Sequence, residues 1–315
     1  SNIITGEITD NGTGVSGVTV TLSGLQSNVR TTDSNGNYSF ELVAGGNYVV
    51  TPTVIGFTFN PPSQTFNNLG APQTANFAGT RQNFVVTNTN NQGAGSLREA
   101  IINANATAGT DTIVFNIPGP GVKTISLVNT LPEITGPVVI DGTTQPGYAG
   151  SPLIEIDGVN INSSTGLVIK AGGTTVRGFA IGRFNQGTAI LVSNCNNNVI
   201  QGNYIGTDAT GTTVRANQIG IQLTNSSNNI IGGTTAATRN VISGNSFRGI
   251  EVSGSNNTIQ GNHIGTNAAG TAALANGIAG IQIPGPSFTN NTIGGTAPGA
   301  GNLISGNSNG IIVNG

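Results

Sequence analysis

Short apolar runs separated by glycine, asparagine and serine fill the chain from Gly187 onward. Apolar and polar positions alternate within each run, as where Gln222 stands between Ile221 and Leu223. A period of two over so short a run predicts a β-strand, and these runs carry no helical period. About three such runs recur in each unit of about 30 residues, which is typical of a repeat architecture.

The chain repeats itself at two lengths. GNYIGTDATGT at 202–212 returns as GNHIGTNAAGT at 261–271, which is 59 residues later. Within this long period, GIQL, GIEV, GIQI and GIIV begin at Gly220, Gly249, Gly280 and Gly310, in steps of 29, 31 and 30 residues. Units of this length that alternate between two variants predict a solenoid. Because each strand stacks on its own equivalent about 4.8 Å away, the pairing is parallel, and the predicted fold is a parallel β-helix.

Asparagines recur at matching places between the predicted strands. The pairs are Asn203 with Asn262, Asn240 with Asn302, and Asn245 with Asn307. Asparagine tolerates left-handed backbone angles, and stacked asparagine amides can hydrogen-bond along a ladder. We expect these residues to have a structural role in the turns and no role in catalysis.

Residues 1–80 have a different pattern, which predicts a small antiparallel β-sandwich. Short alternating strands are expected at 18–22, 38–42, 47–51 and 74–77. The stretch resembles the carboxypeptidase regulatory-like or Cna-B-like sandwich modules of bacterial surface proteins, through ITGEITDNGTGVSGVTVTL at 4–22, TTDSNGNYSF at 31–40 and GGNYVVTP at 45–52. This resemblance implies a spacer or stalk without catalytic activity.

A second domain is predicted over 83–315, and one helix is expected near its start. Ser96 and Glu99 form an S-x-x-E capping box. Leu97, Ala100, Ile101 and Ala104 then fall on one helical face, which predicts an amphipathic helix at about 96–105. The open end of a β-helix leaves an apolar interior exposed, so we expect this helix to serve as its N-terminal cap.

The segment that begins with this helix is similar to the SLREA-type module found at the start of many bacterial surface β-helices. The matching residues are SLREA at 96–100, DTIVFNIPG at 111–119 and PVVIDGTTQPG at 137–147. The resemblance implies a right-handed β-helix, which the preferred handedness of parallel crossovers also favours. We expect irregular coils over 111–185 and regular coils over 186–315.

The composition narrows the range of functions. Only 7% of the residues are charged, against about 25% in ordinary globular proteins, and the net charge is −2. No basic patch is present, so we do not expect nucleic acid as a partner, and no apolar stretch is long enough for a membrane span. No cofactor motif stands in a fitting context, and the single Cys195 has no partner for an internal disulfide. The absence of methionine suggests a mature or excised fragment.

Asp141, Glu155 and Asp157 are the candidate catalytic residues. The isoleucines of VVID and LIEID are expected to point inward, so the three acids are expected to point outward on neighbouring coils. Enzymes that act on polysaccharides use clustered carboxylates, often beside cations such as Lys170, Arg177 and Arg183. In the alternative interpretation, which the sequence favours, Asp141-Gly142 and Asp157-Gly158 are turn formers at strand ends.

These patterns favour an extracellular or cell-surface structural protein, a stiff rod for scaffolding, adhesion or filament assembly. Ile311 and Val313 continue the inward rows and would form an uncovered edge. Either more chain follows, or another chain covers this edge, for example a further copy in head-to-tail assembly. Two alternatives remain open: a polysaccharide-acting enzyme, and a non-catalytic glycan-binding module that uses outward residues such as Tyr204. The expected partners are therefore copies of the chain, other surface proteins or glycans.

Overall fold

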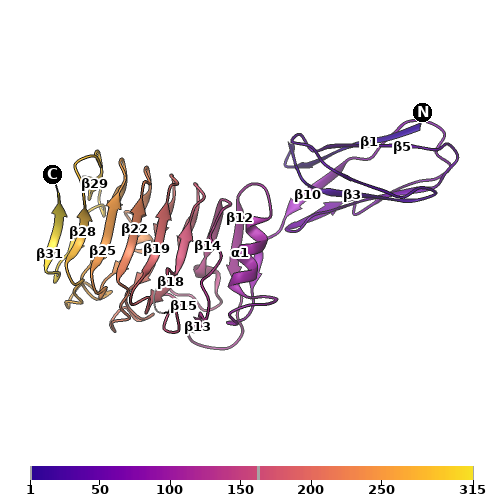
Figure 1. The fold of residues 1–315 in the computed structure, drawn as a ribbon. Coiled ribbons are helices and arrows are strands. Elements are labelled where there is room, and N and C mark those ends of the chain that lie inside the picture. Colours follow the sequence, from indigo (N-terminus) through magenta and orange to yellow (C-terminus); the bar gives the residue numbers. More distant parts are fainter. Residues whose placement is uncertain (1, 162–163, 315) are drawn as a thin grey trace. The chain divides into compact units, whose positions relative to one another are not determined.

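Strands make up most of the regular structure in the computed structural model of this protein, which describes residues 2–161 and 164–314. The described residues contain one α-helix, α1 (Leu97–Asn105), and two short 3-10 helices, η1 (Gly142–Thr144) and η2 (Ala236–Thr238). The chain divides into two units (Figure 1). One comprises the chain up to Asn83 together with Ala106–Gly109, and the other comprises Phe84–Asn105 and the chain from Thr110 onward.

The first unit is a β-sandwich of short strands around its own core. Its strands are β1 (Asn2–Asp10), β2 (Thr13–Gly14), β3 (Thr19–Gly24), β4 (Asn28–Thr31), β5 (Asn37–Leu42), β6 (Tyr48–Thr53), β7 (Phe57–Asn60), β8 (Gln64–Phe66), β9 (Gln73–Thr74) and β10 (Phe77–Arg81). One sheet has the order β4-β3-β6-β8, and in the other β1 pairs with β2, β5, β9 and β10. The pairing is mainly antiparallel, as predicted, and β1 also runs parallel to β9 and β10.

Inward residues on the two sheets form the sandwich core. Ile4, Ile8, Val20, Leu22 and Phe40 are each at most 1% exposed, and they alternate with exposed positions along their strands. This alternation is the pattern from which the sandwich was predicted.

The second unit is a parallel β-helix built from three sheets. The first sheet contains β11 (Phe84–Val86), β12 (Asp111–Phe115), β14 (Val138–Asp141), β17 (Thr175–Arg177), β20 (Val199–Gln201), β23 (Ile230–Gly232), β26 (Thr258–Gln260) and β29 (Thr292–Ile293). The second contains β13 (Lys123–Ser126), β15 (Ile154–Asp157), β18 (Phe179–Gly182), β21 (Tyr204–Ile205), β24 (Val241–Ile242), β27 (His263–Ile264) and β30 (Leu303–Ile304). The third contains β16 (Leu167–Ile169), β19 (Thr188–Ser193), β22 (Ile219–Thr224), β25 (Arg248–Ser253), β28 (Ala279–Ile283) and β31 (Asn309–Val313). From β14 onward each coil adds one strand to each sheet.

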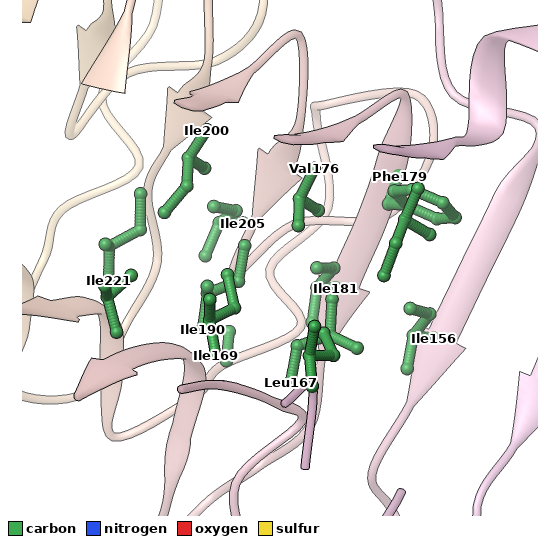
Figure 2. Packing of buried hydrophobic residues seen from close by; sticks show 14 of the residues in the cluster. Ile156, Leu167, Ile169, Val176, Phe179, Ile181, Ile190, Ile200, Ile205 and Ile221 are labelled. Carbon is green, nitrogen blue, oxygen red and sulfur yellow. The ribbon is translucent and has the colours of Figure 1, made fainter. Parts of the chain in front are cut away.

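Rows of aliphatic side chains run along the inside of the three sheets (Figure 2). In the second sheet, Ile156, Ile181, Ile205, Ile242 and Ile264 follow one another in register and are each at most 1% exposed. The other two sheets carry equivalent rows, and all three belong to one hydrophobic cluster. Each buried isoleucine contributes about 1.5–3 kcal/mol, so the rows supply much of the stability of the β-helix.

The glycine that begins each GI motif allows the coils to approach closely. A Cβ on Gly220 would lie 2.5 Å from the carbonyl oxygen of Gly249, and one on Gly249 would lie 2.6 Å from that of Gly280. Real Cβ atoms essentially never approach an oxygen so closely. This contact explains why glycine recurs at the start of the third-sheet strands.

Asparagines form a ladder at each of the three corners between the sheets, and all are buried except the last member of each ladder, which is half-buried. The ladders are Asn203-Asn240-Asn262-Asn302, Asn217-Asn245-Asn276-Asn307 and Asn198-Asn229-Asn257-Asn291. In each step the side-chain oxygen of one asparagine accepts from the preceding asparagine, for example from the backbone N–H of Asn203 to Asn240 at 2.9 Å. The predicted amide ladder is present, and each predicted pair lies two coils apart with a third asparagine between its members.

The left-handed backbone predicted for these asparagines was wrong. Residues with positive φ include Asn197, Asn228, Asn256 and Asn290, each of which directly precedes a ladder asparagine, whereas no ladder member has positive φ. At the corner between the third and first sheets, the sequence signal is therefore an Asn-Asn pair, in which the first member turns the chain and the second bonds along the axis. At the other two corners a glycine with positive φ precedes several ladder asparagines, as Gly202 precedes Asn203 and Gly244 precedes Asn245.

Long and short loops alternate between two corners, and this alternation produces the 59-residue repeat. The loop between the first and second sheets is long at 233–240 and 294–302 and short at 202–203 and 261–262. The loop between the second and third sheets is long, at 206–218 and 265–278, in the coils whose first loop is short. Long loops at the same corner contact each other across the intervening coil, as where the Ala268 N–H donates to the Gly211 carbonyl at 2.9 Å.

The helix lies at Leu97–Asn105, close to its predicted range, but an N-terminal capping helix is not supported. Strand β11 precedes α1, so the helix is an insertion between the first two strands of the first sheet. Its buried residues Leu97, Ala100, Ile101 and Ala104 belong to the same hydrophobic cluster as the coils. The amphipathic pattern identified the helix and its inward face correctly, because both depend only on local spacing.

We expect removal of one corner amide to destabilise the β-helix. Asn257 is fully buried and accepts from both the backbone and side-chain N–H groups of Asn229, at 2.9 and 3.0 Å. Asn257→Ala leaves these donors buried without an acceptor, so the free energy of unfolding should fall by about 2–4 kcal/mol. Urea denaturation followed by circular dichroism measures this change.

The neighbouring residue supplies a matched control. Asn256 is exposed and has a φ of 59°, which glycine adopts without strain. Asn256→Gly should change the free energy of unfolding by less than about 0.5 kcal/mol. Equal effects of the two substitutions would contradict a role for the ladder in stability.

Candidate functional site

The candidate acids lie at or near the ends of two strands of the β-helix. Asp141 ends β14 and Asp157 ends β15, and each directly follows a buried, inward isoleucine. Both aspartates are only 5% exposed, so neither carboxylate is open to solvent. Glu155 lies on β15 and is half-buried. The two aspartates stand where a strand gives way to a corner, and their contacts show what holds them there.

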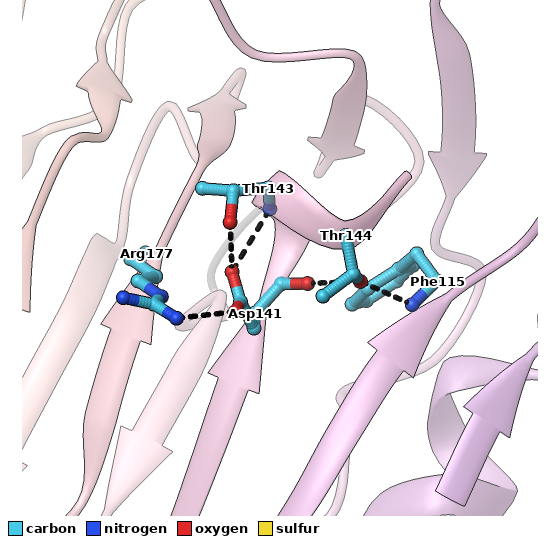
Figure 3. A network of polar contacts seen from close by, with 5 residues as sticks. All are labelled: Phe115, Asp141, Thr143, Thr144 and Arg177. Carbon is cyan, nitrogen blue, oxygen red and sulfur yellow. Dashed lines mark hydrogen bonds and ion pairs between the residues drawn. The ribbon is translucent and has the colours of Figure 1, made fainter. Parts of the chain in front are cut away.

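Asp141 organises the turn that follows its strand (Figure 3). Its carboxylate accepts from the Thr143 N–H at 3.0 Å and from the Thr143 hydroxyl at 2.5 Å, and it pairs with Arg177 of the next coil at 2.6 Å. The Thr144 hydroxyl donates to the Asp141 carbonyl and accepts from the Phe115 N–H, at 2.7 and 2.8 Å. The contacts with Phe115 and Arg177 join the turn to the coils on either side of it, and the others hold the turn itself.

Asp157 has the same kind of environment at the next corner. It accepts from the Val159 N–H at 3.1 Å and from Arg183 Nε at 2.7 Å, and its second oxygen pairs with Arg183 Nη2. Arg183 itself has a φ of 68°, an uncommon backbone conformation for a side chain of this size. The two-point ion pair holds this arginine in place and neutralises the buried carboxylate.

Glu155 also lacks the surroundings of a catalytic acid. Its carboxylate accepts from the Ala209 N–H and from the Thr124 hydroxyl, both at 3.1 Å. The cavity that it shares with Asp157 and Arg183 has a volume of only about 10 Å³. A space of this size holds at most about one water molecule, so no sugar ring can lie between these acids.

The cations expected near the acids are distributed among separate ion pairs. Arg177 and Arg183 each neutralise one aspartate, whereas Lys170 pairs with Glu133 at 2.7 Å on the surface. Asp141 does not line the small cavity of Glu155 and Asp157. The geometry therefore favours turn formation over acid–base chemistry for these residues.

Ser96 and Glu99 stabilise the start of α1 in a modified form of the predicted capping box. The Ser96 hydroxyl accepts from the Glu99 N–H at 3.2 Å, as expected. The Glu99 carboxylate accepts from the Gly95 N–H at 2.9 Å, not from Ser96. The reason is that the Ser96 N–H already donates to the Gly93 carbonyl.

The candidate assembly edge is exposed within the described residues. Ile311 and Val313 on β31 are 45% and 64% exposed, although they continue the inward row of the third sheet. The equivalent Ile281 and Ile283 one coil earlier are 0% and 8% exposed. A further strand layer would cover these two side chains.

A larger cavity lies beside Tyr204, on the outer face of the second sheet. Its volume is about 200 Å³, and Arg239 and Ala268 also line it. Tyr204 was expected among the residues of a glycan-binding surface, whereas Arg239 was not expected at the site. Alignment of the two repeat copies could have revealed Arg239, because the following copy has Gly301 at the matching position.

His263 lies two strands beyond Tyr204 in the same outward row of the second sheet. Its Nδ1 is 3.1 Å from the Ala268 carbonyl oxygen. Burial, and then the charge of Arg239, hold the pKa of His263 below its ordinary value of 6.5. The folded chain therefore binds a proton at His263 less readily than the unfolded chain does.

Neither a metal cluster nor a membrane-spanning helix occurs in the part of the chain that the structure describes. No three histidine, cysteine, aspartate or glutamate side chains there lie close enough together to hold a metal ion. Within 2–161 and 164–314, no helix is both long and apolar enough to cross a bilayer.

Comparison with known families identifies the sandwich. Residues 3–80 match the carboxypeptidase regulatory-like domain. This range is almost the whole segment for which the sequence analysis noted that resemblance. No curated protein matches the chain.

We expect the ion pair of Asp157 to be structural. Arg183→Gln should lower the free energy of unfolding by about 2–3 kcal/mol, because the nearly buried carboxylate loses its counter-ion. Adding Asp157→Asn should restore at least about 1 kcal/mol, since the unpaired charge is then removed while the bond to Val159 remains possible. Urea denaturation of the two single variants and the double variant measures the coupling.

The exposed ion pair of Lys170 is the control for this cycle. Its two side chains are 44% and 49% exposed, so Lys170→Gln should cost less than about 1 kcal/mol. Additive losses in the Asp157→Asn and Arg183→Gln cycle would show that the two side chains do not stabilise each other.

We also expect a pH-dependent contribution to stability from His263. As the pH falls below the ordinary value of 6.5, the unfolded chain binds a proton at this histidine before the folded chain does. Stability is therefore lost as the pH falls toward the folded pKa. His263→Tyr, which introduces the residue of the preceding copy, should remove this contribution.

Urea midpoints of both proteins from about pH 5 to about pH 8 measure this effect. The carboxylates titrate in both proteins, so their contributions cancel in the stability difference between them. That difference should still change across this pH range, because only the wild-type chain has His263. Parallel profiles would exclude the contribution of His263.

Proposed function

We propose that this protein is an extracellular or cell-surface structural protein in which the β-helix is a stiff rod for scaffolding or adhesion. The observation that carries the proposal is the continuity of the aliphatic rows and asparagine ladders from coil to coil. Side chains that bond along the axis resist both bending and local opening. The carboxypeptidase regulatory-like domain at 3–80 is consistent with a spacer attached to such a rod.

The segment from Ser96 onward is, in this proposal, an SLREA-type module that begins the rod. Two features support the assignment: α1 follows Ser96 directly, and its apolar face packs into the core of the coils. The helix thus links the SLREA sequence to the first turns of the β-helix.

The fixed positions of the acids also support a structural role. Asp141 and Asp157 are each paired with an arginine and bonded to turn N–H groups. A general acid or base needs access to its substrate, and the neighbouring cavity is too small for a sugar ring. A polysaccharide-acting enzyme that uses these residues is therefore the weaker alternative.

End-to-end assembly is the second candidate function, because β31 presents an apolar edge. Ile311 and Val313 lie in register with a fully formed inward row, so the edge matches another strand layer in shape and polarity. A contact between this edge and a different surface of another copy is heterologous, and heterologous contacts build open filaments.

We expect the chain to associate in a way that depends on this edge. Ile311→Lys with Val313→Lys should prevent association, since two buried charges would replace apolar contacts. Leu25→Lys is the control, because Leu25 is as exposed as Val313, at 64%, and lies in the sandwich. Sedimentation velocity over a concentration series, with electron microscopy of the same samples, measures the association.

A wild-type chain that remains monomeric throughout the series, or equal association of all three proteins, would contradict end-to-end assembly. The structural role is tested separately with a panel of polysaccharides. Release of reducing ends that disappears on combining Asp141→Asn, Glu155→Gln and Asp157→Asn would replace the structural role with an enzymatic one.

A further inference from the structure

The cavity beside Tyr204 is formed by loops from both long-loop corners. Tyr204 and Val241 are neighbours in the outward row of the second sheet, and both line it. Ala237 and Arg239 come from the long loop at 233–240, and Ala268 comes from the long loop at 265–278. The cavity therefore lies in an outer surface on which two sets of stacked loops converge.

Arg239 gives this cavity a positive charge without a counter-ion. Its Nε donates to the Gly261 carbonyl at 3.2 Å, which fixes the guanidinium group at the end of the loop. Arg177, Arg183 and Arg248 each pair with a carboxylate, whereas within residues 2–161 and 164–314 no carboxylate lies within ion-pair distance of Arg239. The remaining guanidinium N–H groups are thus available for a ligand.

The charged and titratable groups near Arg239 do not offset its positive charge. Together with burial, the larger cause, the charge of Arg239 lowers the pKa of the nearby His263. Asp141, whose charge acts on the neighbouring Tyr148, is already neutralised by Arg177. An anionic group is the ligand that this arrangement favours, and a guanidinium binds a carboxylate through two parallel hydrogen bonds.

The size and the aromatic lining define the rest of the ligand. The volume of about 200 Å³ is below the ~300–1,000 Å³ of sites for drug-sized ligands, so it suits one sugar ring. The C–H groups of a pyranose pack against aromatic faces, and the half-buried Tyr204 ring supplies one. We propose that this cavity binds one uronate residue of an acidic polysaccharide, with its carboxylate on Arg239 and its ring against Tyr204.

The neighbouring repeat shows that the site is specific to one copy. At the matching positions it has His263 in place of Tyr204, Gly301 in place of Arg239 and Leu303 in place of Val241. The loss of the arginine removes the cation, and the larger leucine occupies more space. These residues are compatible with the same coil geometry, so they supply substitutions that the fold accepts.

The test uses methyl galacturonoside as the acidic probe and methyl galactoside as its neutral match. Saturation-transfer NMR and titration calorimetry at low salt should detect binding of the acidic sugar to the wild-type chain. Affinity for the neutral sugar should be at least about tenfold lower, because it lacks the carboxylate. Arg239→Gly should lower the affinity for the acidic sugar at least about tenfold, and Tyr204→His should lower it for both sugars.

Arg30→Gln in the sandwich is the control for general loss of positive charge, and it should bind the acidic sugar as the wild-type chain does. Circular dichroism of each variant shows whether the fold is retained. The proposal is overturned if the wild-type chain does not bind, if both sugars bind equally, or if Arg239→Gly binds normally. Equal losses in Arg239→Gly and Arg30→Gln would also overturn it. None of these outcomes bears on the structural role of the rod, which does not require a ligand.

Discussion

Every coil of the β-helix has to turn at the same three places as its neighbours, because its strands bond only to their equivalents one layer away. At each corner the strand ladder stops, and buried backbone N–H groups still need acceptors. The asparagine ladders supply them: each amide oxygen receives N–H groups from the preceding coil, and each amide nitrogen donates in turn. The corners therefore set the register, and the isoleucine rows fill the space that this register encloses.

The same requirement explains the two buried aspartates of the less regular coils. Asp141 and Asp157 stand at corners and accept N–H groups of their turns, as asparagine amides do elsewhere. Unlike an asparagine amide, a carboxylate cannot donate a hydrogen bond to the next coil, and its charge makes burial costly. Arg177 and Arg183 provide both the donors and the opposite charge, so each ion pair serves as the charged form of a corner contact.

Local pattern predicted the strands, the helix and the sandwich, because alternation and capping depend on neighbouring residues. It also predicted that the repeated asparagines would stack. It placed Arg177 and Arg183 near the acids but did not show that Asp141 would pair with Arg177 in particular, since they are 36 residues apart and the irregular coils have no period from which to count. The cavity beside Tyr204 could not be predicted from local pattern either, because residues from several coils line it. Comparison of the two copies, in which Arg239 aligns with Gly301, was the one sequence signal that pointed to it.

The alternation of long and short loops also limits how such a β-helix can change in length during evolution. Each layer rises only about 4.8 Å, which is too little for two bulky loops to lie directly above one another at the same corner. Loss or gain of a single coil would bring two long loops into adjacent layers, whereas loss or gain of a pair preserves the spacing seen between Gly211 and Ala268. Duplication should therefore lengthen the molecule in increments of two coils, or about 9.6 Å.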